Sequence, residues 1–174
     1  MPKNSSFKGF LPSTSFAMAV CKKRVKPQQG LINTISTPQS ATTLFGRGNQ
    51  KPELLFVGES FNEAACKLLD KMIEAMGVKV SEVFIAEIHA HAAFEKAAVD
   101  LHAPKLIVTL GDHASELLLG KEVSSAKKSG SLYQWAGYPV IASFSPEYLL
   151  KHPAAKKEAW DDLKFVMKHL KWKK

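Results

Sequence analysis

Four short, mainly apolar runs recur along the last two thirds of the chain, each containing a glycine or a polar residue at or near its end. They are ELLFVGES from Glu53, SEVFIAEI from Ser81, PKLIVTLG from Pro104 and YPVIASFSP from Tyr138. Unbroken apolar runs of this length are typical of strands covered on both faces. The pattern therefore predicts four buried strands.

The segments between these runs have the periodicity of helices. The clearest is residues 62–77, where one helical face carries an apolar stripe and Gly77 can end the helix. Shorter helices are expected over residues 92–101 and 112–119, the second between Asp112 as N-cap and Gly120 as stop signal. A last helix is expected over residues 153–170, with proline at its start and lysines in its final turns.

The alternation of strands with helices predicts the fold class. We expect an α/β protein, a three-layer α/β/α sandwich around a mainly parallel four-stranded sheet. In such sheets, functional groups collect beyond the carboxyl ends of the strands. Those ends here are Glu59, Glu87, Gly111 and Ser145.

The charge distribution separates an N-terminal arm from a domain. The chain has a net charge of +8, yet the first 50 residues hold seven Lys or Arg and no Asp or Glu, while residues 51–174 hold seventeen against sixteen. We therefore expect residues 1–50 to be a basic, flexible arm and linker and residues 51–174 to form the domain. In the arm, Lys22, Lys23 and Arg24 are the candidates for contacting a phosphate backbone or a protein partner.

The number and spacing of the cysteines limit which cofactors the protein can bind and in which cellular compartment we expect it. Cys21 and Cys66 lack CxxC spacing, so they indicate neither a disulfide framework nor a metal or cluster site. We expect no cofactor, a cytoplasmic location and no membrane association, since no run approaches the roughly 20 apolar residues of a span. A targeting peptide over residues 7–21 is the less favoured alternative, because its basic residues follow the apolar part.

Four segments carry a family resemblance. LLFVGES, LLDKMIEAMGVKVSEVFIAEI, APKLIVTLGDHASELLLG and SPEYLLKHPAAKKEAWDDLKFV follow one another between residues 53 and 166. Together they resemble the uracil-DNA glycosylase superfamily, most closely its iron–sulfur-containing branch. The resemblance implies an α/β domain that acts on DNA by extracting a base from the stack and hydrolysing its glycosidic bond.

The family's first strand ends in a Gly-Glu-(Ala or Gly)-Pro-Gly turn, followed by a loop that handles water and stacks the base. Gly58 and Glu59 match that turn, but Ser60 and Phe61 lead directly toward the helix. By this resemblance Glu59 is the candidate for positioning water, and Phe61 is the candidate for stacking the base. Gly58 and Ser60 would complete that wall of the base pocket.

Two further family positions carry different residues here. Glu87 replaces an Asn that reads the uracil edge, and Ser145-Pro146 replaces a His-Pro whose imidazole supports charge on the departing base. An ionised Glu only accepts hydrogen bonds, so it would repel the uracil carbonyl oxygens. Losing an oxyanion-type donor costs about 2.7–4 kcal/mol. The cluster-ligating cysteines of the family are also missing.

Other polar residues have both a functional and an ordinary interpretation. Lys127, Lys128 and Lys151 are candidates for contacts with a nucleic-acid backbone, although solvated lysines are as common. His89 and His91 lack a third metal ligand at recognisable spacing. The remaining candidates, for which ordinary packing is the better interpretation, are His113, His152, Cys66 and Trp160.

Three functions fit this pattern. The favoured one is a degenerate superfamily member of DNA repair or replication that binds DNA or a protein partner with weak or no glycosylase activity. Two segments also resemble the psi subunit of the bacterial DNA polymerase III clamp loader, a silent relative with an N-terminal partner-binding peptide, a role open to residues 1–50. The alternatives are an active glycosylase for uracil or another deaminated base, and a helper domain whose pocket has no role.

Overall fold

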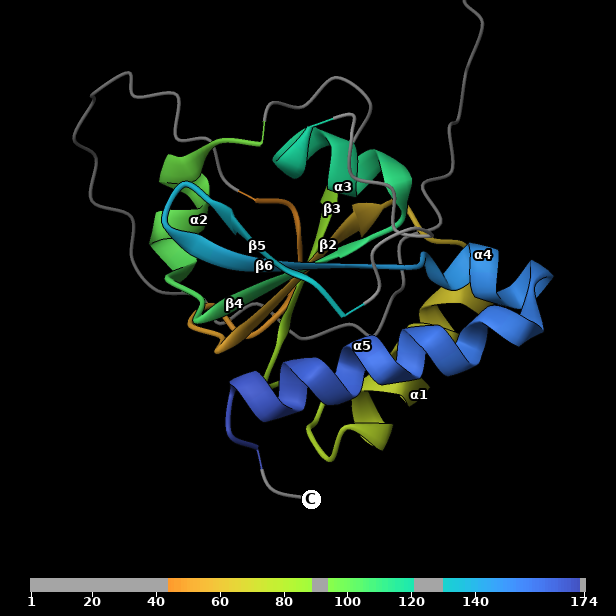
Figure 1. Ribbon diagram of the computed structural model, residues 1–174. Coiled ribbons are helices and arrows are strands. Elements are labelled where there is room, and N and C mark those ends of the chain that lie inside the picture. The colour runs from red at the N-terminus through yellow and green to blue at the C-terminus, as the bar shows by residue number, and fades with distance from the viewer. Residues whose placement is uncertain (1–43, 89–93, 121–129, 173–174) are drawn as a thin grey trace, which may run out of the picture.

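Figure 1 shows a computed structural model of the chain, which describes residues 44–88, 94–120 and 130–172. One sheet runs through the centre, with strand order β1-β3-β2-β4-β6-β5. The strands are β1 (Gly46–Gly48), β2 (Leu54–Glu59), β3 (Phe84–Ile88), β4 (Leu106–Leu110), β5 (Leu132–Trp135) and β6 (Tyr138–Ser143). The helices are α1 (Glu63–Ala75), α2 (Lys96–His102), α3 (Asp112–Leu119), α4 (Pro146–Lys151), the 3₁₀ turn η1 (Pro153–Ala155) and α5 (Lys156–His169).

The predicted fold class is confirmed. The four central strands, β3, β2, β4 and β6, pair in parallel as expected. Helices α1 and α5 lie on one face of the sheet and α2 and α3 on the other (Figure 1). The sheet has six strands instead of four because a short antiparallel strand is added at each edge.

The edge strand β1 lies upstream of the boundary expected at Lys51. Arg47 in this strand forms an ion pair with Asp70 of α1. The backbones of β1 and β3 approach closely, since a Cβ atom on Gly46 would lie 2.1 Å from the carbonyl oxygen of Ile85. One of the basic residues assigned to the arm therefore belongs to the sheet.

The other edge strand, β5, forms a hairpin with β6. Its two-residue turn is Ala136-Gly137, and both residues have positive φ, 52° and 96°. Positive φ at both central positions is the type I′ geometry that matches the twist of hairpin strands. The turn therefore places β5 directly against the strand that leads to Ser145.

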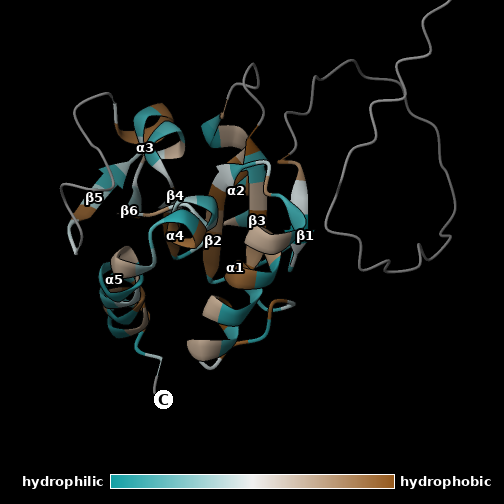
Figure 2. Cartoon of the chain, turned by 90° about the vertical axis from the view of Figure 1, so that its right-hand side faces the viewer, coloured by the Kyte–Doolittle hydropathy of each residue, from teal (hydrophilic) through white to brown (hydrophobic). Residues whose placement is uncertain are grey.

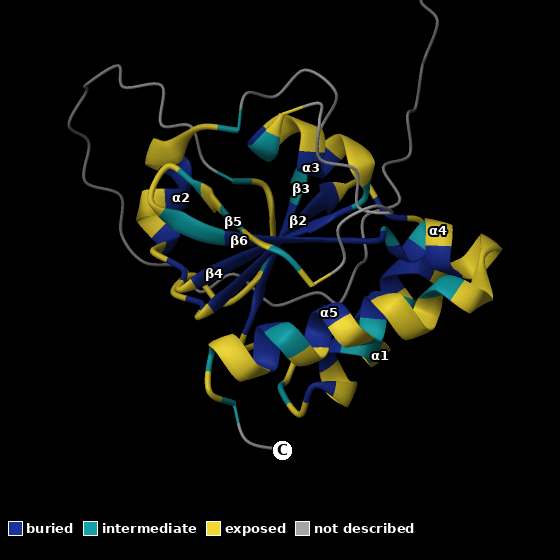
Figure 3. Cartoon of the chain, in the orientation of Figure 1, coloured by how far each residue is buried: buried dark blue, intermediate teal, exposed yellow. Residues whose placement is uncertain are grey.

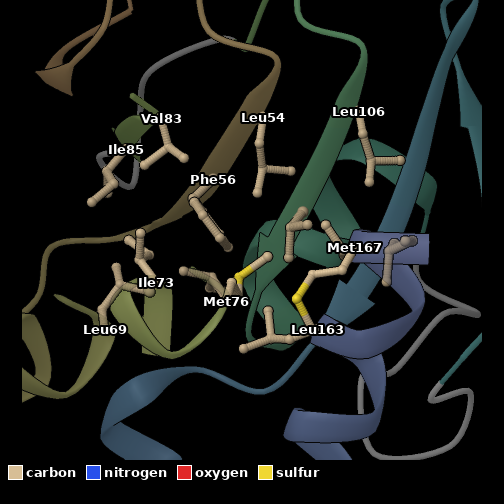
Figure 4. Close-up of a cluster of buried hydrophobic side chains, with 14 of the residues drawn as sticks. Leu54, Phe56, Leu69, Ile73, Met76, Val83, Ile85, Leu106, Leu163 and Met167 are labelled. Carbon is tan, nitrogen blue, oxygen red and sulfur yellow. The ribbon is translucent and has the colours of Figure 1, made fainter. Parts of the chain in front are cut away.

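Alternating strand residues form a core on each face. Figure 4 shows the first cluster, in which strand side chains such as Leu54 and Phe56 meet Ile73 of α1 and Leu163 of α5. The opposite face packs Leu55 and other strand residues against α2 and α3. Strands β2 and β3 are accordingly brown, the colour of hydrophobic residues, in Figure 2, and the central strands are mainly buried in Figure 3, where exposed residues lie mainly on the helices. Two covered faces explain the unbroken apolar runs.

The C-terminal helical region begins earlier than residue 153 and is interrupted. Helix α4 starts directly after β6, with Pro146 at its first turn and Ser145 as N-cap, whose Oγ accepts a hydrogen bond from the backbone N–H of Tyr148 at 3.2 Å. Pro153 then opens η1, and α5 begins at Lys156. Proline cannot continue the hydrogen bonding of a helix, so the break follows from the sequence.

The end of the described chain is attached near the start of β2. The indole N–H of Trp172 donates to Glu53 at 2.9 Å, and Lys105 pairs with the same carboxylate. The hydrogen bonds from Lys105 and Trp172 lower the pKa of Glu53. This contact lies at the amino end of the strand, away from the strand ends considered below.

Candidate functional site

A cavity of about 190 Å³ lies at the carboxyl ends of the central strands. It is lined by three turns, those that follow β2, β4 and β6. The lining residues are Glu59, Ser60, Phe61, Leu110, Gly111, Asp112, His113, Ser145 and Glu147. The structure thus brings Glu59, Ser60 and Phe61 together with Ser145, which is far from them in the sequence.

The wall formed by Phe61 depends on Gly58. A Cβ atom on Gly58 would lie 2.4 Å from Cζ of Phe61 and 3.2 Å from Cβ of Leu110. The phenyl ring therefore covers the space that any other residue at position 58 would fill. Phe61 is 6% exposed, so the ring is part of the core and also borders the cavity.

Replacing Gly58 with alanine is expected to lower the free energy of unfolding by about 1–3 kcal/mol, because the new methyl group overlaps the ring of Phe61. Urea unfolding measures the change. In the Phe61→Leu background the same Gly58→Ala change should cost clearly less, since the ring is absent. Equal costs in the two backgrounds would show that the ring does not depend on the glycine.

The turns after β4 and β6 are in close contact. The backbone N–H of Gly111 donates to the carbonyl of Ser143 at 2.8 Å. Gly111 has φ of 97°, and a Cβ atom there would lie 3.0 Å from Cβ of Ser145. Both the conformation and the close approach require glycine at this position. Ser145 is thereby fixed beside the start of α3.

His113 and Glu59 are in contact at the cavity. Nδ1 of His113 lies 2.7 Å from Oε1 of Glu59, and the two side chains are 46% and 61% exposed. The residues reach each other because β2 and β4 are adjacent parallel strands that end together. The sequence favoured ordinary packing over a phosphate contact for this histidine, since a helix-start residue carries no signal of its partner across the sheet.

Glu147 connects two helix starts at the rim of the cavity. Its Oε1 accepts hydrogen bonds from the side-chain amide of Asn62 at 3.0 Å and from the Asn62 backbone N–H at 3.4 Å. Asn62 is also the N-cap of α1, accepting from the N–H of Ala65 at 2.9 Å. The start of α4 therefore holds the turn that carries Glu59 and Phe61.

Asp162 supports the site from the α5 side. It is fully buried, and its two oxygens accept from Oγ of Ser143 at 2.8 Å and from the backbone N–H of Gly130 at 2.7 Å. Ser143 is the last residue of β6, two positions before Ser145. A buried carboxylate with strong donors fixes the strand end and the entry to β5.

Glu87 lies apart from this cavity. In β3, Phe84, Ala86 and Ile88 face α2 and α3, so the alternation directs Glu87 toward the opposite face. It pairs with Gly58 across the sheet, and Phe61 covers that glycine. Glu87 is half-buried and does not line the cavity, and neither does Pro146, which is buried in α4.

Most of the basic residues considered as DNA contacts lie outside the described residues. These are Lys22, Lys23, Arg24, Lys127 and Lys128, and the same holds for His89 and His91. Lys151 is exposed at the end of α4. Among the other candidates, His152 packs on the ring of Tyr148, Trp160 packs half-buried against the first core cluster, and Cys66 is buried in it.

The chain does not fit an iron–sulfur cluster. Such clusters are held by four thiolates, or by two thiolates and two histidines in one variant. The whole chain has two cysteines, and Cys66 is 3% exposed within the core. Within the described ranges, no three His, Cys, Asp or Glu side chains are grouped to hold a metal ion, and no helix is long and apolar enough to cross a membrane.

Comparison with known proteins agrees with this architecture. The sequence profile described as "Uracil DNA glycosylase superfamily" matches residues 45–164. The "Type-4 uracil-DNA glycosylase" of Sulfurisphaera tokodaii is 30% identical, with 70% of this chain and 71% of that protein aligned. The protein of the same name from Saccharolobus solfataricus is 27% identical, covering 72% and 74%. The resemblance seen in the sequence is thereby confirmed, and the chain belongs to the uracil-DNA glycosylase superfamily.

Proposed function

We propose that this protein acts in DNA repair as a weak DNA glycosylase, hydrolysing the N-glycosidic bond of uracil or another deaminated base. The observation that carries the proposal is the cavity at the strand ends, where Glu59, Phe61 and Ser145 converge. Family membership supplies the reaction class, and the similar type-4 uracil-DNA glycosylases support uracil as a substrate. DNA is accordingly the proposed partner.

Each of the three residues has a chemical role in this proposal. Phe61 offers a ring face or edge to an extruded base. The hydroxyl of Ser145 accepts a hydrogen bond from Tyr148, which leaves its own proton to donate to a carbonyl oxygen of the base. Glu59, exposed at the end of β2, is the group that handles the attacking water. The bond between C1′ and the base nitrogen breaks with its electron pair going to the base, and the water oxygen bonds to C1′.

The activity is proposed to be weak for two reasons. Ser145 donates one neutral hydrogen bond where the family has an imidazole, and a missing oxyanion-type interaction lowers the rate about 10²–10³-fold. Glu87, at the position of the base-reading amide, does not border the cavity. Among the described residues, no Asn or Gln amide lines the cavity to donate to and accept from the base edge at two adjacent positions.

Incubation with labelled single- and double-stranded oligonucleotides tests the proposal. We expect wild-type protein to release uracil, hypoxanthine or xanthine slowly, leaving abasic sites that alkali converts to strand breaks. Glu59→Gln should reduce the single-turnover rate at least about tenfold, because a neutral amide cannot supply the negative charge that the carboxylate contributes to activating the water. Abasic sites that form equally in wild-type and Glu59→Gln samples would reveal a contaminating enzyme and refute the proposal.

A catalytically silent DNA- or partner-binding protein is the second candidate. This candidate is favoured because polar residues of the site make hydrogen bonds that stabilise the fold: Ser145 caps α4, and Glu147 accepts a hydrogen bond from Asn62. In that case the partner contacts are proposed to lie in residues 1–50. The same oligonucleotide assay separates the candidates, because a silent protein shifts the labelled DNA in a gel without producing any abasic site.

A further inference from the structure

We propose that His113 is the catalytic base of this site, taking a proton from the attacking water while Glu59 orients its imidazole. The inference rests on the proposed glycosylase function and adds a residue from α3 to it. It derives from the contact between Nδ1 of His113 and Oε1 of Glu59, at 2.7 Å, on the wall of the cavity.

The geometry favours this division of roles. A carboxylate beside Nδ1 stabilises the tautomer that carries its proton there, leaving Nε2 as the acceptor. Nε2 has no hydrogen-bond partner among the described residues, and His113 is partly exposed at the cavity. One oxygen of Glu59 is occupied by the contact with the imidazole. Glu59 can therefore act indirectly, by orienting the imidazole of His113, which contacts the water.

The position of His113 is fixed by backbone features of the site. It is the second residue of α3, directly after the turn in which Gly111 packs against Ser145. Within α3, Oγ of Ser115 donates to the carbonyl of Gly111 at 2.8 Å and lies 2.8 Å from Oγ1 of Thr109. These buried bonds join the first turn of the helix to the end of β4. The imidazole is thus carried on a rigid element beside Ser145.

The charged groups around His113 are all acidic among the residues that line the cavity. Glu59 comes from the end of β2, Asp112 precedes His113 on α3, and Glu147 comes from α4. Glu116 follows one turn later on α3 and is exposed. Of these carboxylates, Glu59 is the one whose oxygen lies 2.7 Å from Nδ1 of the imidazole.

The chemical step balances without a further reactant. A water bonded to Nε2 of His113 attacks C1′ and gives its proton to that nitrogen. The bond from C1′ to the base breaks with its electron pair moving to the base, whose carbonyl oxygen accepts the Ser145 hydroxyl proton in a hydrogen bond. The proton held by His113 then passes to the departing base through solvent, restoring the neutral imidazole.

Single-turnover release of the base that wild-type protein excises tests this role, using the full chain and the variants His113→Gln, Glu59→Gln and both together. We expect His113→Gln to lower the rate about 10²–10⁴-fold with little change in DNA affinity. The double variant should be no slower than the slower single variant, since the two residues act as a unit. His169→Gln, an exposed histidine at the end of α5, is the matched control and should retain the wild-type rate.

The pH profile separates a catalytic role from a structural one. The dependence of the single-turnover rate on pH should differ between wild-type protein and His113→Gln, because the variant lacks the general base. If wild-type protein releases a base while His113→Gln keeps its rate and profile, the inference is wrong and the proposed function stands. If wild-type protein releases no base from any substrate, both are wrong.

Discussion

Replacing Ser145 with histidine is expected to raise the rate of uracil release about 10²–10³-fold, the effect of restoring one strong interaction with the departing base. Position 145 borders the cavity and adjoins Gly111, so an imidazole there would start from the strand end that the family uses. Single-turnover release from a uracil-containing strand measures the gain. The lost N-cap of α4 should cost about 1 kcal/mol of stability, which urea unfolding reports separately.

Ser145→Asn is the matched control for that experiment. Asparagine keeps a capping side chain and adds a polar group of similar reach, but it has no imidazole. It should leave the rate within a few fold of wild type. If Ser145→His is no faster than Ser145→Asn at equal DNA affinity, the serine is not what limits the reaction.

Replacing Asp162 with alanine is expected to lower the free energy of unfolding by about 2–4 kcal/mol. The change removes hydrogen bonds from Ser143 and Gly130 to a buried carboxylate and leaves both donors without that acceptor. Urea denaturation followed by tryptophan fluorescence measures the loss. Ser143→Ala removes one of the two donors and should cost less, about 1–2 kcal/mol.

Asp162→Asn tests whether the charge of Asp162 or only its packing stabilises the fold. The amide retains one accepting oxygen, so it can keep one of the two bonds, and its cost should fall between those of Ser143→Ala and Asp162→Ala. A fully stable alanine variant would show that the strand end and the entry to β5 do not depend on α5. The order of the three losses in the free energy of unfolding therefore measures how strongly Asp162 stabilises the end of β6 and the entry to β5.

The central layer of the fold was predictable because its signals are local. Unbroken apolar runs, helical stripes and glycine stops are properties of consecutive residues, and they indicated the four parallel strands and the helices around them. The edge strands carry no such signal. Strand β1 has three residues, two of them glycine, and the β5–β6 turn is Ala-Gly instead of the more usual Asn-Gly.

The sequence predicted only those features of the site that follow from the common direction of the parallel strands. Glu59 and Ser145 follow parallel strands, so their meeting at one edge follows from topology. Glu87 is the second-last residue of β3, and the alternation of side chains places it on the opposite face of the sheet from Glu59. The contact between His113 and Glu59 depends on the relative register of β2 and β4, which no local pattern reports.

The link between Glu147 and Asn62 has a mechanical consequence. Two residues 85 positions apart in the chain connect the N-cap of α1 to the first turn of α4 through exposed hydrogen bonds, so a shift of one helix start is passed to the other while these bonds hold. A ligand that displaces the start of one of these helices would also displace the start of the other. A spectroscopic label on α1 would thus report events at α4, which makes this pair of helix starts a natural place to observe whether anything enters between them.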